Sequence, residues 1–215
     1  TAAKLHSMGV RTAWEYTQLP DYAVRRMFAL PGLRTWRELR GEPCIEFEDG
    51  FEAKQSICVS RSFSREVVEV GELVEQIANF ASTMAEKLRR QKSVVSEMTV
   101  FAYTNRFKDN APQTYGNSLV HFEHPSSDQR TIVSRAVAAA KELYRCGYGY
   151  KKAGVVATRL MQESDFVHSL FEDTSALERE HKLTSALDAI NGTFGKGTVK
   201  LAVQGNGHIK SFSER

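Results

Sequence analysis

Residues 71–91 carry the most regular apolar pattern in the chain. Their large apolar side chains are spaced four, three, four and four residues apart, at Leu73, Ile77, Phe80, Met84 and Leu88. This spacing is typical of a helix with one buried face, so a second layer must cover that face. With 41% hydrophobic and 26% charged residues, the chain has a globular composition, and its 215 residues fit one to two domains.

Alternating segments on both sides of this helix predict the covering layer. Four strands are expected, at about 54–64, 94–106, 115–123 and 150–160. A second helix is expected between the last two strands, where Ser126 and Gln129 are spaced as a capping box. The order β-α-β-β-α-β is the split βαβ arrangement, and the fold class is α+β. Both helices would cover one face of a four-stranded sheet and leave the other face free.

The first strand raises the question of what that free face binds. Ser60, Ser62 and Ser64 share one parity, and Arg61 and Arg65 lie among them. Small hydroxyls and guanidinium groups suit a sheet that a phosphate chain approaches closely. By strict alternation Arg61 has the parity of Phe63, so it either lies at the rim of the sheet or follows a bulge.

The other strands add aromatic and basic groups to this face. The second strand offers Thr99, Phe101, Tyr103 and Asn105 on the parity opposite its core residues. The bases near the strand ends are Arg106, Lys108, Lys151 and Lys152. Such a face suits a nucleic-acid backbone, although for any single residue the simpler explanation is favoured, that the base is solubilising and the ring is packed.

Charge is unevenly distributed along the chain, whose net charge is +3. Residues 54–160 hold sixteen Lys/Arg against ten Asp/Glu, which favours an anionic polymer as the partner. Residues 44–53 hold four acids and no bases, so we interpret them as an extended linker. Residues 161–215 form an acidic tail, with helical spacing near 183–190 and a short strand expected at 199–203.

Several classes of function have no support in the sequence. Cys44, Cys58 and Cys146 form no CxxC or Cys/His cluster, so neither a zinc site nor a disulfide framework is predicted. No apolar run is long enough to span a membrane, and no membrane partner is expected. We find no nucleophile–base motif and no metal-ligand spacing, so no catalytic residue, metal site or cofactor is predicted in these residues.

Residues 1–43 are expected to form short helices. Gly9 ends the first helix as a C′ glycine, and Thr12 caps the next, Ala13 to Gln18. A third helix opens at Pro20–Asp21, and a fourth runs from Gly32 to Leu39. The corner at Gly9 and Thr12 could hold a DNA phosphate on backbone N–H groups, but a plain helical hairpin explains it as well.

Six stretches of the chain, in order, resemble one protein family. They are KLHSMGVRTAWEYTQLP, LRTWRELRGEPC, SICVSRSFSR, YGNS, GYGYKKAGV and GTFGKGTVKLAVQG. With these stretches, the chain resembles the C-terminal half of UmuC-like Y-family lesion-bypass DNA polymerases. Because its first residue is Thr1 and not Met, we also expect it to be a fragment of a longer protein.

The resemblance implies a role for each region. Residues 1–43 would be part of the thumb, 44–53 the linker, 54–160 the little finger and 161–215 a UmuC-type extension that binds partners. The catalytic palm, with its Mg²⁺, would lie before Thr1, so the fragment alone would not polymerise DNA. The residues implied in primer–template binding are Ser60, Arg61, Ser62, Phe63, Ser64 and Arg65, with weaker support for Lys151 and Lys152.

Partners are also implied by the resemblance. Leu170 and Phe171 match the hydrophobic end of a sliding-clamp motif whose earlier positions are not kept. A UmuD′-type subunit, a RecA filament and a cytoplasmic, nucleoid-associated location follow from the family's role in SOS lesion bypass. The alternative is a stand-alone ferredoxin-like module that binds nucleic acid or protein without polymerase domains.

Overall fold

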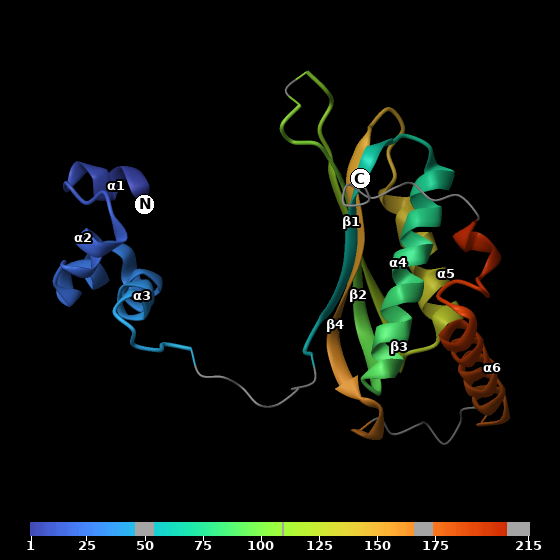
Figure 1. Cartoon of the computed structure of the whole chain (residues 1–215). Coiled ribbons are helices and arrows are strands. Elements are labelled where there is room, and N and C mark those ends of the chain that lie inside the picture. Colours follow the sequence, from blue (N-terminus) through green and yellow to red (C-terminus); the bar gives the residue numbers. More distant parts are fainter. Residues whose placement is uncertain (46–53, 109, 166–173, 206–215) are drawn as a thin grey trace. The chain divides into compact units, whose positions relative to one another are not determined.

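The computed structural model describes residues 1–45, 54–108, 110–165 and 174–205 (Figure 1). The chain divides into two compact units, residues 1–52 and 53–215, and each is described by itself. The division falls at the end of the acidic segment that the sequence predicts as a linker. Among the described helices, none has the length and apolar character needed to cross a membrane.

The first unit contains three helices, α1 (Ala2–Ser7), α2 (Ala13–Thr17) and α3 (Asp21–Leu39). They enclose a small core of Val10, Tyr16, Val24, Leu33 and Trp36. Two helical segments make up α3, because Ala29 between them has the non-helical angles φ 54° and ψ −157°. The predicted break between a third and a fourth helix is therefore confirmed.

The second unit has the predicted element order. Its elements are β1 (Ile57–Val67), α4 (Val70–Arg90), β2 (Ser93–Thr104), β3 (Tyr115–Ser126), α5 (Gln129–Leu143) and β4 (Tyr150–Gln162). The four strands form one sheet in the order β1-β4-β2-β3, and every neighbouring pair is antiparallel. The α+β class and the β-α-β-β-α-β order are confirmed.

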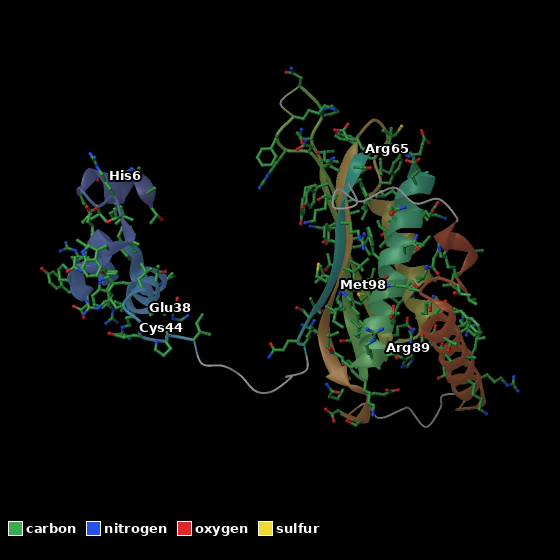
Figure 2. The ribbon with its side chains drawn as sticks, viewed as in Figure 1. His6, Glu38, Cys44, Arg65, Arg89 and Met98 are labelled. Carbon is green, nitrogen blue, oxygen red and sulfur yellow. The ribbon has the colours of Figure 1, made fainter. Side chains whose placement is uncertain are left out.

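Helices α4 and α5 lie on the same face of the sheet (Figure 1). The predicted apolar stripe of α4 is buried, with Leu73, Ile77, Met84 and Leu88 all 0% exposed. Met98 of β2 meets this stripe from the sheet (Figure 2). The core therefore lies between the sheet and the helices, and the opposite sheet face is left for other contacts.

Two local predictions in this unit are wrong. Strand β1 begins at Ile57 and runs to Val67, three residues later at each end than expected. The cap of α5 is Asp128, whose Oδ2 accepts the Thr131 N–H at 2.8 Å, and no Ser126–Gln129 capping box forms. Ser126 instead ends β3 as the partner of Val95, and its hydroxyl accepts the Asp128 N–H at 3.0 Å.

The tail contributes two short 3-10 turns, η1 (Glu163–Asp165) and η2 (Ala202–Gln204), and the helix α6 (Thr174–Phe194). The strand expected at 199–203 is wrong, because the Leu201 N–H donates to Gln204 Oε1 at 2.8 Å and closes a turn. Helix α6 lies on the outer side of the α4–α5 layer (Figure 1). The described part of the tail thus belongs to the second unit.

Polar contacts attach the tail to the helix layer. Arg89 of α4 donates from Nε and Nη2 to the Asp188 carboxylate of α6, at 2.6 and 2.7 Å, and from Nη1 to the Ser127 carbonyl at 2.9 Å (Figure 2). Asn79 of α4 pairs with Gln204, donating to its carbonyl oxygen and accepting from its Nε2, both at 3.1 Å. Because Gln204 is buried, these bonds hold η2 against α4.

Candidate nucleic-acid interface

Cross-strand pairing arranges the sheet face opposite the helices into rows. From the end nearest the β2–β3 loop, the rows are Ser62–Lys152–Tyr103–Tyr115, Ser60–Gly154–Phe101–Asn117 and Cys58–Val156–Thr99–Leu119. Residues paired directly across strands project to the same side of a sheet. The prediction that Thr99, Phe101 and Tyr103 share the free face is confirmed, since Met98, Val100 and Ala102 between them are 0% exposed.

Three aromatic rings form a stack on this face. The Phe101 and Tyr103 ring centroids are 6.0 Å apart with planes at 15°, and those of Tyr103 and Tyr115 are 5.7 Å apart with planes at 20°. These values fall in the range of offset-stacked pairs. The Lys152 ammonium lies 5.9 Å from the Tyr103 centroid, within cation–π range.

Gly154 allows the stack to lie close to the sheet. A Cβ atom at this position would lie 2.8 Å from the Phe101 ring and 2.4 Å from the Ser60 Cβ. Such distances are too short for real contacts, so any larger side chain would displace the ring or its neighbours. The glycine therefore positions Phe101, and through it the stacked tyrosines.

A groove of about 740 Å³ opens beside the stack, between the β2–β3 loop and the adjacent ends of β1 and β4. We name it the loop groove. Its lining residues are Ser62, Tyr103, Thr104, Asn105, Arg106, Phe107, Gln113, Thr114, Tyr115, Lys151 and Lys152. Three of them are basic and none is acidic, so the lining carries an excess of positively charged side chains.

The predicted β1 residues divide between the two faces of the sheet. Ser60 and Ser62 lie on the free face, and Ser64 is exposed. Phe63 does not line this face: its side chain is 1% exposed and packs in the helix-side core, as its parity predicts, so the DNA contact that the family motif implies at this position cannot come from its ring. The physical reason is parity, since Ile57 and Val59 precede it on the same buried side.

Arg61 lies at the rim of the sheet. It pairs with Ala153 in a register that continues unbroken from Ile57 to Ser62, and the shift in pairing comes only after Ser62. Of the two alternatives left by the sequence, the rim position holds and a bulge at Arg61 does not. Arg61 is exposed there, because β1 is an edge strand of the sheet.

Partners inside the chain occupy three of the other predicted bases. Arg65 forms a two-pronged ion pair with Glu72, and its hydrogen bond lowers the pKa of the Glu72 carboxyl. Lys108 Nζ lies 3.1 Å from both carboxylate oxygens of Glu66. Lys151 donates to the Phe63 carbonyl at 2.6 Å, within the irregular part of β1.

Two predicted bases remain directed to the loop groove. Lys152 lies beside the Tyr103 ring, and the Arg106 guanidinium lies 5.2 Å from the centroid of Phe107. Both side chains line the groove together with Ser62. Tyr103, Asn105 and Lys151 line the same groove, so the tertiary structure brings six of the sequence-predicted residues to one place.

The corner at Gly9 and Thr12 is already satisfied from within the first unit. The Gly9 N–H donates to the His6 carbonyl at 3.0 Å, and the Thr12 N–H donates to Glu15 Oε2 at 3.0 Å. Backbone donation from Arg11 and Thr12 lowers the pKa of Glu15, which keeps its carboxylate charged. The expectation of a phosphate on these N–H groups is corrected, because the capping-box carboxylate takes the place of the anion.

Two aromatic residues that line the loop groove were not predicted. Tyr115 and Phe107 are 67% and 82% exposed, and both lie at or beside the β2–β3 loop. Tyr115 could have been predicted from strand alternation and from its pairing with Tyr103. Phe107 could not, because loop residues follow no period. Leu170 and Phe171, predicted for clamp binding, lie outside the described residues.

Within the described part of the chain, no group of three or more His, Cys, Asp or Glu side chains is placed to hold a metal ion. The loop groove accordingly offers aromatic faces, hydroxyls, amides and cations. This donor set suits binding of an anionic, ring-containing polymer through stacking and charge.

Most of the chain is similar in sequence to known proteins. Residues 54–170 match the impB/mucB/samB family C-terminal domain, and residues 181–212 match a domain of unknown function, DUF4113. The chain is 36% identical to Protein UmuC of Salmonella typhimurium (strain LT2) over 203 residues, and 33% identical to Protein ImpB of Salmonella typhimurium over 203 residues. Each alignment covers 94% of this chain, with 48% of UmuC and 47% of ImpB.

A more distant relative is DNA polymerase IV of Desulfatibacillum aliphaticivorans, 26% identical over 200 residues, which are 93% of this chain and 49% of that protein. The chain thus spans about half the length of the curated relatives it matches. The family model covers more than half of the chain, including the whole sheet and both covering helices. The chain therefore belongs to the impB/mucB/samB family, whose C-terminal domain it contains.

Proposed function

We propose that this chain is the DNA-gripping part of an error-prone translesion DNA polymerase, acting in SOS lesion bypass. The observation that carries the proposal is the free sheet face, where hydroxyls and cations lie opposite the helix layer in a groove without acids. The family relatives named UmuC and DNA polymerase IV support the polymerase class. Nucleotidyl transfer, with its Mg²⁺, is assigned to a palm domain outside these residues.

Contacts to phosphates fit this task for a physical reason. Phosphate contacts hold the register of a duplex without reading its sequence, so a damaged base does not disturb them. Ser62, Lys152 and Arg106 line one groove and can contact successive phosphates. A cytoplasmic, nucleoid-associated location, a UmuD′-type subunit and a RecA filament complete the proposal.

Salt dependence tests the grip. We expect fluorescence anisotropy to show binding of several primer–template duplexes with similar affinity, weakening linearly in log[salt]. The Lys152→Ala/Arg106→Ala variant should reduce the slope of log K against log[salt] by roughly 2, because about 0.9 is lost per phosphate contact. Arg65→Ala is the matched control: its guanidinium already pairs with Glu72, so the slope should change little.

Two results would contradict the proposal. One is the absence of duplex binding at low salt, and the other is a strong preference for one base sequence. An unchanged slope in the double variant would instead show that the duplex contacts another face. In that case a stand-alone module that binds protein becomes the better reading of the free sheet face.

The sliding clamp is a further proposed partner, through Leu170 and Phe171. We expect pull-down with the clamp to recover the wild-type chain and to lose the Leu170→Ala/Phe171→Ala variant, because the two side chains would form the hydrophobic plug. Leu183→Ala, which removes a 45% exposed side chain of α6, is the control. Equal recovery of all three proteins would remove the clamp from the proposal.

A further inference from the structure

We propose that the loop groove binds an unpaired nucleotide of single-stranded DNA, with its base stacked on Tyr115 and its phosphate near Lys152 and Arg106. This inference rests on the proposed function and goes further, because the proposed grip on duplex phosphates requires no contact to a base. It names a second kind of contact, to a base face, and places it at the end of the sheet beside the β2–β3 loop.

The aromatic stack is the first observation. Phe101, Tyr103 and Tyr115 lie in nearly parallel planes at centroid spacings of 6.0 and 5.7 Å, and Tyr115 is the last ring of the series. Phe101 lies against the sheet over Gly154, whereas Tyr115 is 67% exposed. A planar base can therefore extend the series at its exposed end, and stacking of a base on a ring tolerates any sequence.

The second observation is the exposed wall across the groove. Phe107 is 82% exposed, with the Arg106 guanidinium 5.2 Å from its ring centroid. Phe107 packs in neither hydrophobic core, so the fold leaves its ring available to a ligand in the groove. The groove between Phe107 and Tyr115 thus offers two aromatic surfaces to one ligand.

Charge and size limit the choice of ligand. The groove volume of about 740 Å³ falls within the usual range for small-ligand sites, and its lining contains Arg106, Lys151 and Lys152 but no carboxylate. Rings together with cations, and without acids, match a base joined to a phosphate. A neutral or basic peptide would gain nothing from the three positive charges.

The nucleotide must be unpaired. In a duplex both faces of each internal base are covered by its neighbours, so an internal base cannot present a face to Tyr115. An unpaired base can leave its stack at little cost. A template strand ahead of the primer terminus supplies such a nucleotide, directly next to the duplex phosphates that Ser62, Lys152 and Arg106 are proposed to contact.

Three DNA ligands separate this inference from the proposed function. The first is a blunt duplex, the second the same duplex with a 5′ overhang of thymidines, and the third carries abasic sites in an overhang of equal length. All are titrated against the full 215-residue chain. The abasic overhang keeps the phosphates and removes the bases, so the difference between the second and third ligands measures all contacts to the bases, and the Tyr115 variants below identify the part due to stacking.

We expect the wild-type chain to bind the thymidine overhang at least about 5-fold more tightly than the abasic one, since one stacked base contributes about 1–3 kcal/mol. Tyr115→Ala should abolish that difference and leave binding of the blunt duplex unchanged. Tyr115→Phe should keep the difference, because it keeps the ring. Leu119→Ala is the matched control, a 54% exposed side chain on the same face of β3 that lies outside the groove.

Equal affinity for the thymidine and abasic overhangs would overturn the inference and leave the groove to a protein partner. So would a Tyr115→Ala chain that retains the full difference. If the wild-type chain did not bind the blunt duplex, the proposed function would be contradicted instead. The experiment therefore distinguishes failure of this inference from failure of the proposed function.

Discussion

Replacing Phe63 with alanine should lower the free energy of unfolding of the second unit by about 3–5 kcal/mol, the usual cost of deleting a buried aromatic ring. The family motif assigns Phe63 to DNA binding, but its side chain is 1% exposed within the core between the sheet and the helices. Urea denaturation followed by circular dichroism measures the change. A loss of this size exceeds the stability margin of many domains, so the variant should be studied at low temperature.

Ser64→Ala is the control for this prediction. Ser64 is the next residue and is exposed, so its replacement should change stability by no more than about 0.5 kcal/mol. Duplex affinity of folded Phe63→Ala, measured at low temperature, should match that of the wild type. If Phe63→Ala kept its stability and lost its affinity for DNA, Phe63 would be a DNA-binding residue, as the family motif implies, and not a core residue.

Replacing Arg89 with alanine should destabilise the second unit by about 2 kcal/mol and release the tail from the helix layer. Arg89 has a side chain 16% exposed, and it holds both the Asp188 carboxylate of α6 and the Ser127 carbonyl before α5. Its loss leaves these acceptors without their charged donor, and hydrogen bonds to charged groups contribute about 1.5–3 kcal/mol. Asp188 is 37% exposed, so solvent moderates the cost.

The neighbouring arginine provides the control. Arg90 pairs with Glu86 on the same helix, but its side chain is 76% exposed, so Arg90→Ala should cost no more than about 0.5 kcal/mol. A double-mutant cycle of Arg89→Ala and Asp188→Ala isolates the pair, with an expected coupling of about 1–2 kcal/mol. Limited proteolysis should cut the α6 segment faster in Arg89→Ala. Equal stability of the two arginine variants would show that the tail docks by other contacts.

These contacts change how the tail is understood. The sequence places the change of character at residue 161, which predicts a separate extension for partner binding. In the structure the described part of the tail packs on α4 through Arg89, Asn79 and Gln204. A partner of this region would therefore meet a surface already supported by the helix layer.

Much of the second unit follows from local patterns. The stripe from Leu73 to Leu88 predicts α4, because apolar side chains at helical spacing have one low-energy arrangement against a sheet. Alternation in β2 likewise places Phe101 and Tyr103 opposite Met98. In the first unit, Gly9 ends α1 and Thr12 caps α2, since both depend on backbone bonds within a few residues.

Side chains that reach across the fold were not predictable in the same way. The sequence offers Arg65 among the serines of the first strand, and Lys108 and Lys152 near the ends of strands, as bases that could contact DNA. The structure pairs the first with Glu72 and the second with Glu66, while Lys152 lies beside an aromatic ring in the groove. A long cation takes the partner that is nearest in space, and the register of four strands decides which partner that is.

The sequence alone determined the family, the α+β class, the order of six elements and the face that is free, because these depend on periodicity and on short motifs. Only the tertiary structure decided which residues of that face act together. It paired Arg65 with Glu72 within the chain and joined Tyr103 to Tyr115 across two strands. These outcomes depend on which residues pair across neighbouring strands, including a shift of three residues in the pairing of β1 with β4 after Ser62. Such pairing is not encoded by residues adjacent in the chain.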